Sequence, residues 1–297
     1  MKIVLSGGTG FIGSKLIPFL IEKENELILL TRNAERAQQQ FPNLRVVAWT
    51  PKEAGQWQRC IDGADAVIHL AGKGILDKRW NRQVKKEIVE SRVLSTQLLV
   101  EAILQSTSPP SVFLSASGVG IYGEVTSPTT ENNPVGDGFL ASVCRDWEQP
   151  LESLHSSSTR AAAMRIGVVL GEAGALPKMK LNMRLLSGFG DDTQFLSWIH
   201  WLDVCQVIWF ALHTDTVSGP LNVTAPIPVT MKQSTVALAK AMGKSFWLPI
   251  PKPAIRLALG EMADAVLIGQ NAVPGKLNSL GYQFKYRTIE EALQDLL

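Results

Sequence analysis

Short apolar runs alternate with longer segments of helical period along the first 170 residues. The runs are KIVLS (2–6), ELILLT (26–31), RVVAW (45–49), DAVIHLAG (65–72), SVFLSAS (111–117) and AAAMRIGVVL (161–170). They are apolar throughout rather than alternately apolar and polar, which is typical of strands that helices cover on both faces. Segment 79–105 has one apolar helical face and predicts a long crossover helix. This alternation of apolar strands and helices therefore predicts a parallel sheet between two layers of helices.

The pattern loosens after residue 170. Stretches punctuated by glycine and proline, GEAGALPKM (171–179) and LLSGFGDDTQF (185–195), are typical of loops that border a smaller lobe. Segment 198–213 then predicts a helix that Asp203 opens as its N-cap, and PLNVT (220–224) predicts a strand. Helical patterns dominate from Thr230 to the end.

Composition excludes several classes of partner. Hydrophobic residues make up 45% of the 297 positions, charged residues 19%, and the formal net charge is +2, too small for a nucleic-acid-binding surface. No apolar stretch reaches the ~18 residues of a membrane span, and glycines interrupt the N-terminal apolar run too early for a secretory signal. The three cysteines form no CxxC pair, so we expect no disulfide framework and no metal site. We expect a cytoplasmic protein with no nucleic-acid or membrane partner.

Glycines are concentrated in the turn after the first predicted strand. Segment 5–16, LSGGTGFIGSKL, contains the spacing Gly8-x-Gly10-x-x-Gly13 and begins the next helix. Glycine tolerates positive φ and lets the backbone approach a pyrophosphate, while the helix N-terminus supplies N–H groups to the anion. An ordinary glycine-rich turn is the alternative, but the position between strand and helix favours a dinucleotide site.

The end of the second predicted strand indicates which dinucleotide is bound. An NAD site usually has a carboxylate there for the ribose hydroxyls, whereas this chain has Thr31, Arg32 and Asn33. A guanidinium forms charge-assisted hydrogen bonds with a 2′-phosphate. The sequence therefore predicts NADP(H), with a solvated arginine as the alternative interpretation of Arg32.

Further motifs follow in a fixed order. They are DAVIHLAG, SASGVGIYG (115–123), MRIGVVLG (164–171) and SWIHWLD (197–203), and in these the chain resembles the extended short-chain dehydrogenase/reductases. More narrowly, Arg79-Trp80, Ser91-Arg92, the triplet DWE (146–148) and the C-terminal segment 259–284 resemble the YfcH-like, or SulA-like, epimerase family proteins.

The resemblance implies an α/β fold, a Rossmann-type doubly wound parallel sheet with a smaller C-terminal α/β lobe on the substrate side. We expect residues 1–170 to form the NADP(H)-binding domain, with 198–224 returning to it. Residues 171–197 and 225–297 are then expected to form the smaller lobe. The resemblance also implies a small-molecule substrate.

In that group a serine or threonine polarises the substrate oxygen, a tyrosine transfers a proton, and a lysine four residues later lowers the tyrosine pKa. Ser117 occupies the serine position. The tyrosine position falls at Phe139 or Leu140 and the lysine position at Val143 or Cys144, so the sequence lacks the pair. Cys144 is a weak alternative proton donor, with inert packing as the other interpretation.

Arg92 stands where the group has an asparagine in its crossover helix. It is a candidate for the charge of the missing lysine or for binding an anionic substrate group, against a structural salt bridge. Together with the glycine turn and the fourth-strand segment, Arg92 completes the predicted cofactor site: Gly7, Thr9, Gly10, Phe11, Ile12, Gly13, Thr31, Arg32, Leu70, Ala71, Gly72 and Arg92. For the substrate we predict Lys73, Trp80, Gln194, Trp198 and, weakly, His200, with packing as the alternative.

Two functions remain open from the sequence. The first is an atypical NADP(H)-dependent oxidoreductase or epimerase-like enzyme that acts on a small carbonyl or nucleotide-sugar-like substrate, as a monomer or homodimer. The second is a non-catalytic NADP(H)-binding sensor or regulatory protein, which the missing tyrosine and lysine favour. Ser117 and the polar SWIHWLD segment favour the enzyme.

Overall fold

The computed structural model describes residues 1–177, 179, 187–189, 192–244 and 248–297. Seven parallel strands form the central sheet, and their spatial order is β12-β7-β5-β4-β1-β2-β3. Their bounds are β1 Lys2–Ser6, β2 Glu26–Thr31, β3 Arg45–Ala48, β4 Ala66–His69, β5 Val112–Gly118, β7 Arg160–Ile166 and β12 Gly219–Val223. The order reverses beside β1, which is the doubly wound arrangement. The predicted α/β fold class is confirmed.

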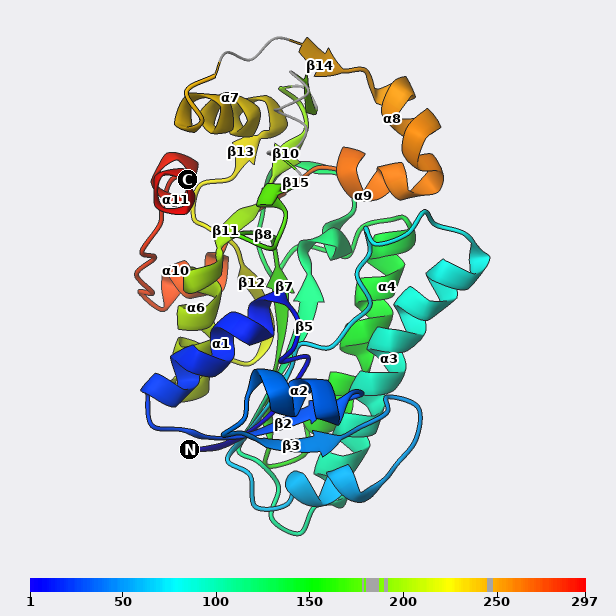
Figure 1. Cartoon of the computed structure of the whole chain (residues 1–297), viewed down its shortest axis with the longest axis vertical. Helices are drawn as coiled ribbons and strands as arrows, with labels where there is room; N and C mark the ends of the chain where they lie inside the picture. The colour runs from blue at the N-terminus through cyan, green and yellow to red at the C-terminus, as the bar shows by residue number, and fades with distance from the viewer. Residues whose placement is uncertain (178, 180–186, 190–191, 245–247) are drawn as a thin grey trace.

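Helices cover both faces of this sheet (Figure 1). Helices α1 (Phe11–Glu22) and α6 (Trp201–His213) pack together on one face, and α3 (Arg82–Gln105) and α4 (Phe139–Glu148) on the other. The short α2 (Ala34–Gln40) connects β2 to β3. Helix α3 is the predicted crossover helix, and it begins where the Asn81 side chain accepts a hydrogen bond from the Val84 N–H.

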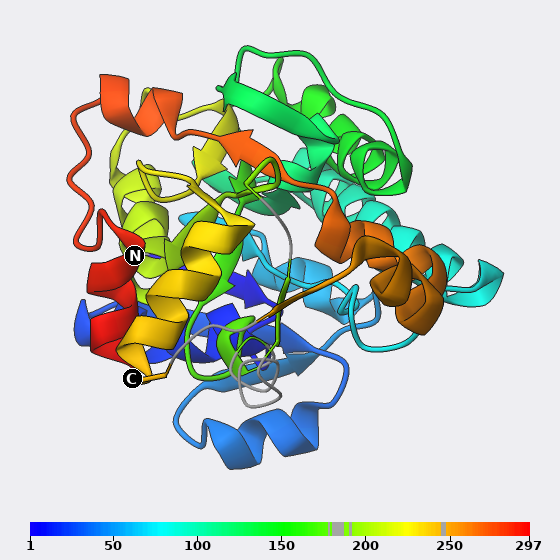
Figure 2. The same cartoon turned by 90° about the horizontal axis from the view of Figure 1, so that it is seen from above.

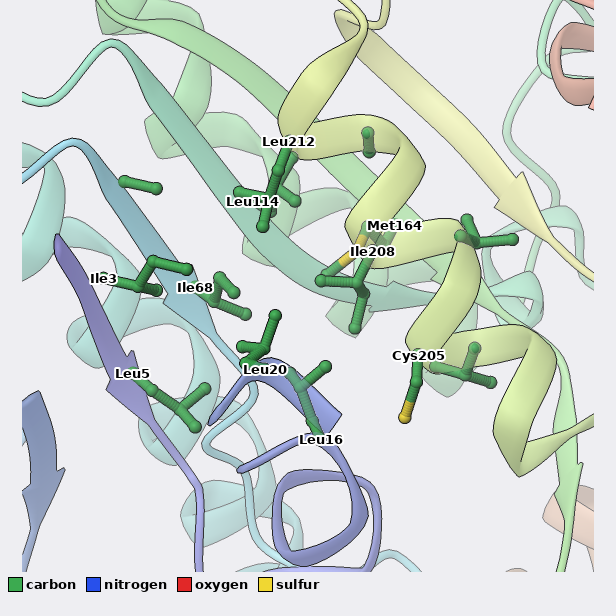
Figure 3. Close-up of a cluster of buried hydrophobic side chains, with 14 of the residues drawn as sticks. Ile3, Leu5, Leu16, Leu20, Ile68, Leu114, Met164, Cys205, Ile208 and Leu212 are labelled. Atoms are coloured by element: carbon green, nitrogen blue, oxygen red, sulfur yellow. The ribbon is translucent and has the colours of Figure 1, made fainter. Parts of the chain in front are cut away.

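The main core lies between the sheet and the α1–α6 layer (Figure 3). Leucine, isoleucine and methionine side chains from alternate positions of the strands meet the apolar faces of both helices. They include Ile3, Leu5, Leu16, Leu20, Ile68, Leu114, Met164, Ile208 and Leu212. A second core fills the opposite face beneath α3.

A smaller core lies beyond the carboxyl edge of the sheet, in the upper part of Figure 1. There α7 (Met231–Ala241) packs against α11 (Ile289–Leu296), and the two helices lie side by side in Figure 2. The strands of this region form pairs: β8 (Val168–Leu170) with β11 (Trp198–His200), β10 (Phe195–Leu196) with β13 (Val229–Thr230), β6 (Val125–Thr129) with β15 (Gln270–Ala272), and β9 (Ser187–Phe189) with β14 (Leu248–Ile250).

The remaining helices of the described chain are short. They are α8 (Lys252–Leu259), α9 (Asp264–Leu267), α10 (Gly275–Ser279) and the 3-10 segments η1 (Gln56–Cys60), η2 (Val119–Tyr122), η3 (Gln149–Leu154) and η4 (Gly260–Ala263). Among the described residues, none of the helices is both long and apolar enough to span a membrane. Residues 180–186, which we expected in the smaller lobe, lie outside the described residues.

The prediction that Asp203 opens the helix was wrong. Helix α6 begins two residues earlier, and His200 is its N-cap, with Nδ1 accepting a hydrogen bond from the Leu202 N–H. The carboxylate of Asp203 instead accepts hydrogen bonds from the backbone N–H groups of Lys285 and Tyr286. Asp203 therefore ties the C-terminal segment to the sheet domain, a long-range role that local capping rules do not reveal.

The glycine turn leads to a stability prediction. A Cβ on Gly13 would lie 2.4 Å from the Gly7 carbonyl oxygen and 2.5 Å from the Gly8 Cα. We expect Gly13→Ala to lower the free energy of unfolding by about 1–3 kcal/mol in urea titrations, because overpacking outweighs the gain in helix propensity. Gly10→Ala is the control, since its Cβ meets only the Gly7 oxygen at 3.3 Å. Equal losses in the two variants would contradict this close-packing argument.

Candidate functional site

The turn between β1 and α1 is shaped by close backbone contacts. Gly7 has a φ of 77°, and a Cβ there would lie 2.5 Å from the backbone of Leu70 and Ala71, which leave β4. Gly13 packs against Gly7 and Gly8 in the same way. The N-cap of α1 is Gly10, which has no side chain to occupy the first-turn N–H groups. A phosphate can therefore approach these donors directly, so the residues present fit a dinucleotide.

A cleft of about 650 Å³ begins at this turn. It runs along the carboxyl ends of β1 to β4 and continues beside α3. Many of the residues predicted to bind cofactor or substrate line it: Gly7, Thr9, Gly10, Thr31, Arg32, Leu70, Ala71, Gly72 and Lys73. Lys73 also forms a salt bridge with Glu87 of α3, which lines the same cleft.

Three residues that follow β3, namely Trp49, Pro51 and Lys52, line the cleft but were missed from the sequence. Lys52 lies at the same end as Arg32, and the Trp49 ring is buried against Trp57 and His69, with centroids 5.9 Å and 6.0 Å away. The Trp49 Nε1–H is buried and has no hydrogen-bond partner. The sequence could have indicated their place in the cleft, because they lie at or just after the end of a predicted strand and the carboxyl ends of adjacent parallel strands meet at one edge of the sheet.

Besides Arg92, which is described below, three predicted cofactor residues do not line the cleft. The Phe11 ring fills the space over Gly171 and Gly174, where an added Cβ would lie 2.5 Å from ring atoms. Ile12 packs on the main core, and Gly13 contacts the turn from within. Their positions shape the cradle and join it to the segment after β8.

Ser117 lies at the end of β5, where its hydroxyl donates to Glu148 Oε1 at 2.6 Å. Glu148 also accepts two hydrogen bonds from Arg165, 2.9 Å from Nε and 2.8 Å from Nη2. Arg165 Nη1 then donates to the Tyr122 hydroxyl, which donates to Asn222. Because its proton is directed at Glu148, Ser117 must exchange that bond before it donates to a substrate oxygen.

Cys144 lies on α4 next to Ser117 and Gly118. Burial, reinforced by the charge of Glu148, raises the pKa of its thiol to about 11, although Arg92 acts in the opposite direction. The thiol is therefore protonated at neutral pH, as in an ordinary packing cysteine.

Arg92 is partly buried, with its guanidinium Cζ 5.0 Å from the centre of the Trp147 ring. Its Nη1 donates to the Ile88 carbonyl oxygen at 3.2 Å. Burial lowers the Arg92 pKa. The guanidinium lies behind Gly72 rather than in the lining of the cleft.

The first turn of α4 lies in an apolar cluster. Phe139 and Trp80 form an edge-to-face pair with centroids 5.0 Å apart, and Leu140 and Met262 pack with them. A cavity of only about 40 Å³ adjoins them. Trp80 is thus 8% exposed, with its Nε1 donating to the Ile75 carbonyl oxygen.

The other predicted substrate residues are buried. Trp198 donates to the Ile227 carbonyl oxygen, and Gln194 donates to that of Val266. His200 stacks on Tyr286, its Nε2 lies 3.3 Å from Asp295, and burial lowers its pKa to about 4. The contacts of all three connect elements of the smaller core, and the structure does not bring them to the cleft.

His69, at the end of β4, is enclosed by two serines. Ser6 lies 2.5 Å from its Nδ1 and Ser95 lies 2.9 Å from its Nε2, and burial lowers its pKa to about 3. It is therefore neutral and joins β1, β4 and α3 beneath the cleft. Across the part of the chain that the structure describes, no three His, Cys, Asp or Glu side chains gather as a metal-binding group.

Residues 3–223 match the NAD dependent epimerase/dehydratase family, and this match covers more than half of the chain. The chain belongs to that family. Residues 250–296 match a domain of unknown function, DUF1731.

Relatives within the family match over the whole chain. Epimerase family protein YfhF of Bacillus subtilis is 37% identical, covering 100% of this chain and 98% of its own. The chloroplastic SDR39U1 homolog of Arabidopsis thaliana is 37% identical, covering 100% and 87%. The crystal structure of human epimerase family protein SDR39U1 (isoform 2) with NADPH has a TM-score of 0.87 and 30% identity, covering 100% and 99%.

The Glu148–Arg165 pair leads to a second stability prediction. The two side chains are 15% and 6% exposed, so Glu148→Gln leaves a buried guanidinium without its counter-charge. We expect a loss of about 3–5 kcal/mol in the free energy of unfolding, measured in urea. Asp146→Asn, in an exposed pair with Arg145, is the control and should cost about 0–1 kcal/mol. Similar losses in the two variants would show that the buried pair stabilises the fold no more than the exposed pair does.

The raised pKa of Cys144 predicts slow alkylation. With a pKa of about 11, only roughly one thiol in a thousand is ionised at pH 8, and iodoacetamide reacts with the thiolate. We expect mass spectrometry to show Cys144 alkylated at least about a hundredfold more slowly in the native chain than in the unfolded chain.

Ionisation of this thiol also links stability to pH. The unfolded thiol releases its proton at lower pH than the folded one, so its contribution lowers the free energy of unfolding as the pH rises above 9. Fast native alkylation of Cys144 at pH 7 would instead identify an activated thiolate.

Proposed function

We propose that this chain is an NADP(H)-dependent oxidoreductase or epimerase-like enzyme, an atypical extended short-chain dehydrogenase/reductase. The single observation that carries the proposal is the cleft that joins the Gly7–Gly13 turn to Arg32. The relative solved with NADPH, at 30% identity over the whole chain, supports the same cofactor. The substrate class is a small carbonyl compound or a nucleotide-sugar-like molecule, bound by a monomer or homodimer.

The preference for NADP(H) over NAD(H) rests on charge. Arg32 and Lys52 line one end of the cleft from two neighbouring strand ends, with Thr31 where an NAD site has a carboxylate. A 2′-phosphate placed between the two cations gains charge-assisted hydrogen bonds that a free hydroxyl lacks. Bound NADP(H) supplies hydride transfer. The residues of this chain supply the cradle, the orientation and the exclusion of water.

The proposed enzyme works without the usual tyrosine and lysine relay. Support comes from α4, whose first turn carries Phe139 and Leu140 in an apolar cluster, with Val143 and the protonated Cys144 one turn later. Ser117 remains the candidate that polarises a carbonyl oxygen, after its hydroxyl turns from Glu148. The proton then comes from water or from the substrate. The narrower likeness to YfcH-like proteins belongs to the same proposal.

A non-catalytic NADP(H) sensor is the second candidate. Two observations favour it: the tyrosine position carries the apolar Phe139 or Leu140 and so offers no proton donor, and the Ser117 hydroxyl is already bonded to Glu148. Incubation of the NADPH-bound chain with aldehydes, ketones and nucleotide sugars separates the two. Oxidation of NADPH, followed at its near-ultraviolet absorbance, supports the enzyme, whereas tight binding without turnover on any of these compounds supports the sensor.

Substitutions at the phosphate end test the cofactor. We expect Arg32→Gln to raise the Kd of NADPH about 10- to 100-fold and that of NADH less than about threefold, because only NADPH has the 2′-phosphate. Lys52→Gln should act in the same direction but less strongly. Fluorescence titration gives both constants.

Arg36→Gln is the matched control, since Arg36 is exposed, lies one turn further along and does not line the cleft. Equal weakening of NADPH and NADH, or a wild-type chain that prefers NADH, would exclude the proposed 2′-phosphate site.

A further inference from the structure

Arg92 is a partly buried cation with few polar contacts. Its Nη1 donates to the Ile88 carbonyl oxygen at 3.2 Å and to Ser91 Oγ at 3.5 Å, and the Trp147 ring covers one face. Within the described residues, no carboxylate forms a salt bridge with it, and Nε and Nη2 make no hydrogen bond.

Two other arginines, the buried Arg165 and the partly buried Arg160, are better satisfied. Arg165 forms two hydrogen bonds with Glu148 and one with Tyr122. Arg160 donates to the carbonyl oxygens of Val217, Ala211 and Leu212, and Asp215 also stabilises its charge. Arg92 is therefore unusual within the described part of this chain.

Partial burial without a counter-charge disfavours the charged form of a guanidinium, and burial lowers the pKa of Arg92. The cation–π contact with the Trp147 ring is weaker than a salt bridge and does not replace a counter-ion. A charge kept under such conditions, beside a cleft, is typical of a functional site.

The guanidinium lies between the cleft and Ser117. On one side is Gly72, which lines the cleft; a Cβ there would lie 3.3 Å from Cζ and 3.4 Å from Nη2. On the other side is Cys144, which interacts with Ser117. The adjacent Trp147 Nε1–H is also buried without a partner. Arg92 and Trp147 therefore lie close together, and each has N–H donors that make no hydrogen bond to the described residues.

We propose that Arg92 and Trp147 bind an anionic group of the substrate, a carboxylate next to the reacting carbonyl. This inference rests on the proposed function for the carbonyl. A carboxylate matches the planar fork of a guanidinium and neutralises its charge. The hydroxyls of a nicotinamide ribose are neutral and leave the charge uncompensated, so the substrate is the better source of the missing anion.

Oxamate, a small carboxylate next to a carbonyl, is the probe, and oxamide is its neutral counterpart of similar shape. Calorimetric titration of the NADPH-bound chain should show that oxamate binds and oxamide does not. We expect Arg92→Met to weaken oxamate at least about tenfold and Arg92→Lys to weaken it less, with the NADPH Kd unchanged within about threefold. Arg145→Gln, an exposed arginine on α4, is the matched control and should change neither constant.

Three results would overturn the inference. The first is that oxamate does not bind the wild-type chain, and the second is that it binds Arg92→Met as tightly as wild type. The third is that Arg92→Met weakens NADPH binding tenfold, which assigns Arg92 to the cofactor. Thermal melting checks that each variant folds, and Arg92→Lys serves where Arg92→Met does not. Repeating the oxamate titration without NADPH separates this inference from the proposed function, because the Arg92 dependence is then measured even where NADPH does not bind.

Discussion

The backbone of the first strand-to-helix turn packs directly against the backbone that leaves β4, with no space for a β-carbon between them. Gly7 and Gly13 make this approach possible, and the phosphate-facing N–H groups of α1 are presented because of it. Leu70, Ala71 and Gly72 line the cleft beside this turn. The cleft is thus a direct consequence of two backbone segments in contact, and side chains add specificity along its length.

Charge is distributed unevenly around this cleft. Arg32 and Lys52 are exposed cations at one end, where they are well hydrated and cost little to maintain. Arg165, beneath the end of β5, is buried but neutralised by Glu148. Arg92 is partly buried, and no carboxylate among the described residues forms a salt bridge with it. Arg165 is thus compensated within the structure, whereas Arg32, Lys52 and Arg92 are the cations for which we propose an external anion.

The smaller core connects to the sheet domain through polar contacts as well as through packing. Asp203 of α6 accepts hydrogen bonds from the backbone of Lys285 and Tyr286, and His200, the N-cap of α6, contacts Asp295 of α11. Met262 joins the cluster around Trp80 and Phe139 from the other side. The C-terminal segment therefore packs over the first turn of α4, which holds the position of the tyrosine in the extended reductases. This packing helps to make that turn apolar.

The sequence by itself determined the strands, the crossover helix, the glycine turn and the family, because each depends on residues close together in the chain. Backbone periodicity and turn chemistry are local, so the apolar runs and the spacing from Gly7 to Gly13 indicate them directly. The position of Arg32 at the carboxyl end of the second strand could also be predicted, since Arg32 follows that strand immediately. The division into two lobes and the roles of the site residues stay predictions.

Only the tertiary structure decided the partners of each polar side chain. Ser117 meets Glu148 across 31 positions, and Asp203 meets Lys285 across 82, distances over which no local rule operates. The burial of Trp198 and His200, the presence of Lys52 in the cleft and the lack of a carboxylate near Arg92 likewise depend on which elements pack together. Packing selects these neighbours because burial makes an unpaired polar group expensive, and that cost is set only once the elements are assembled.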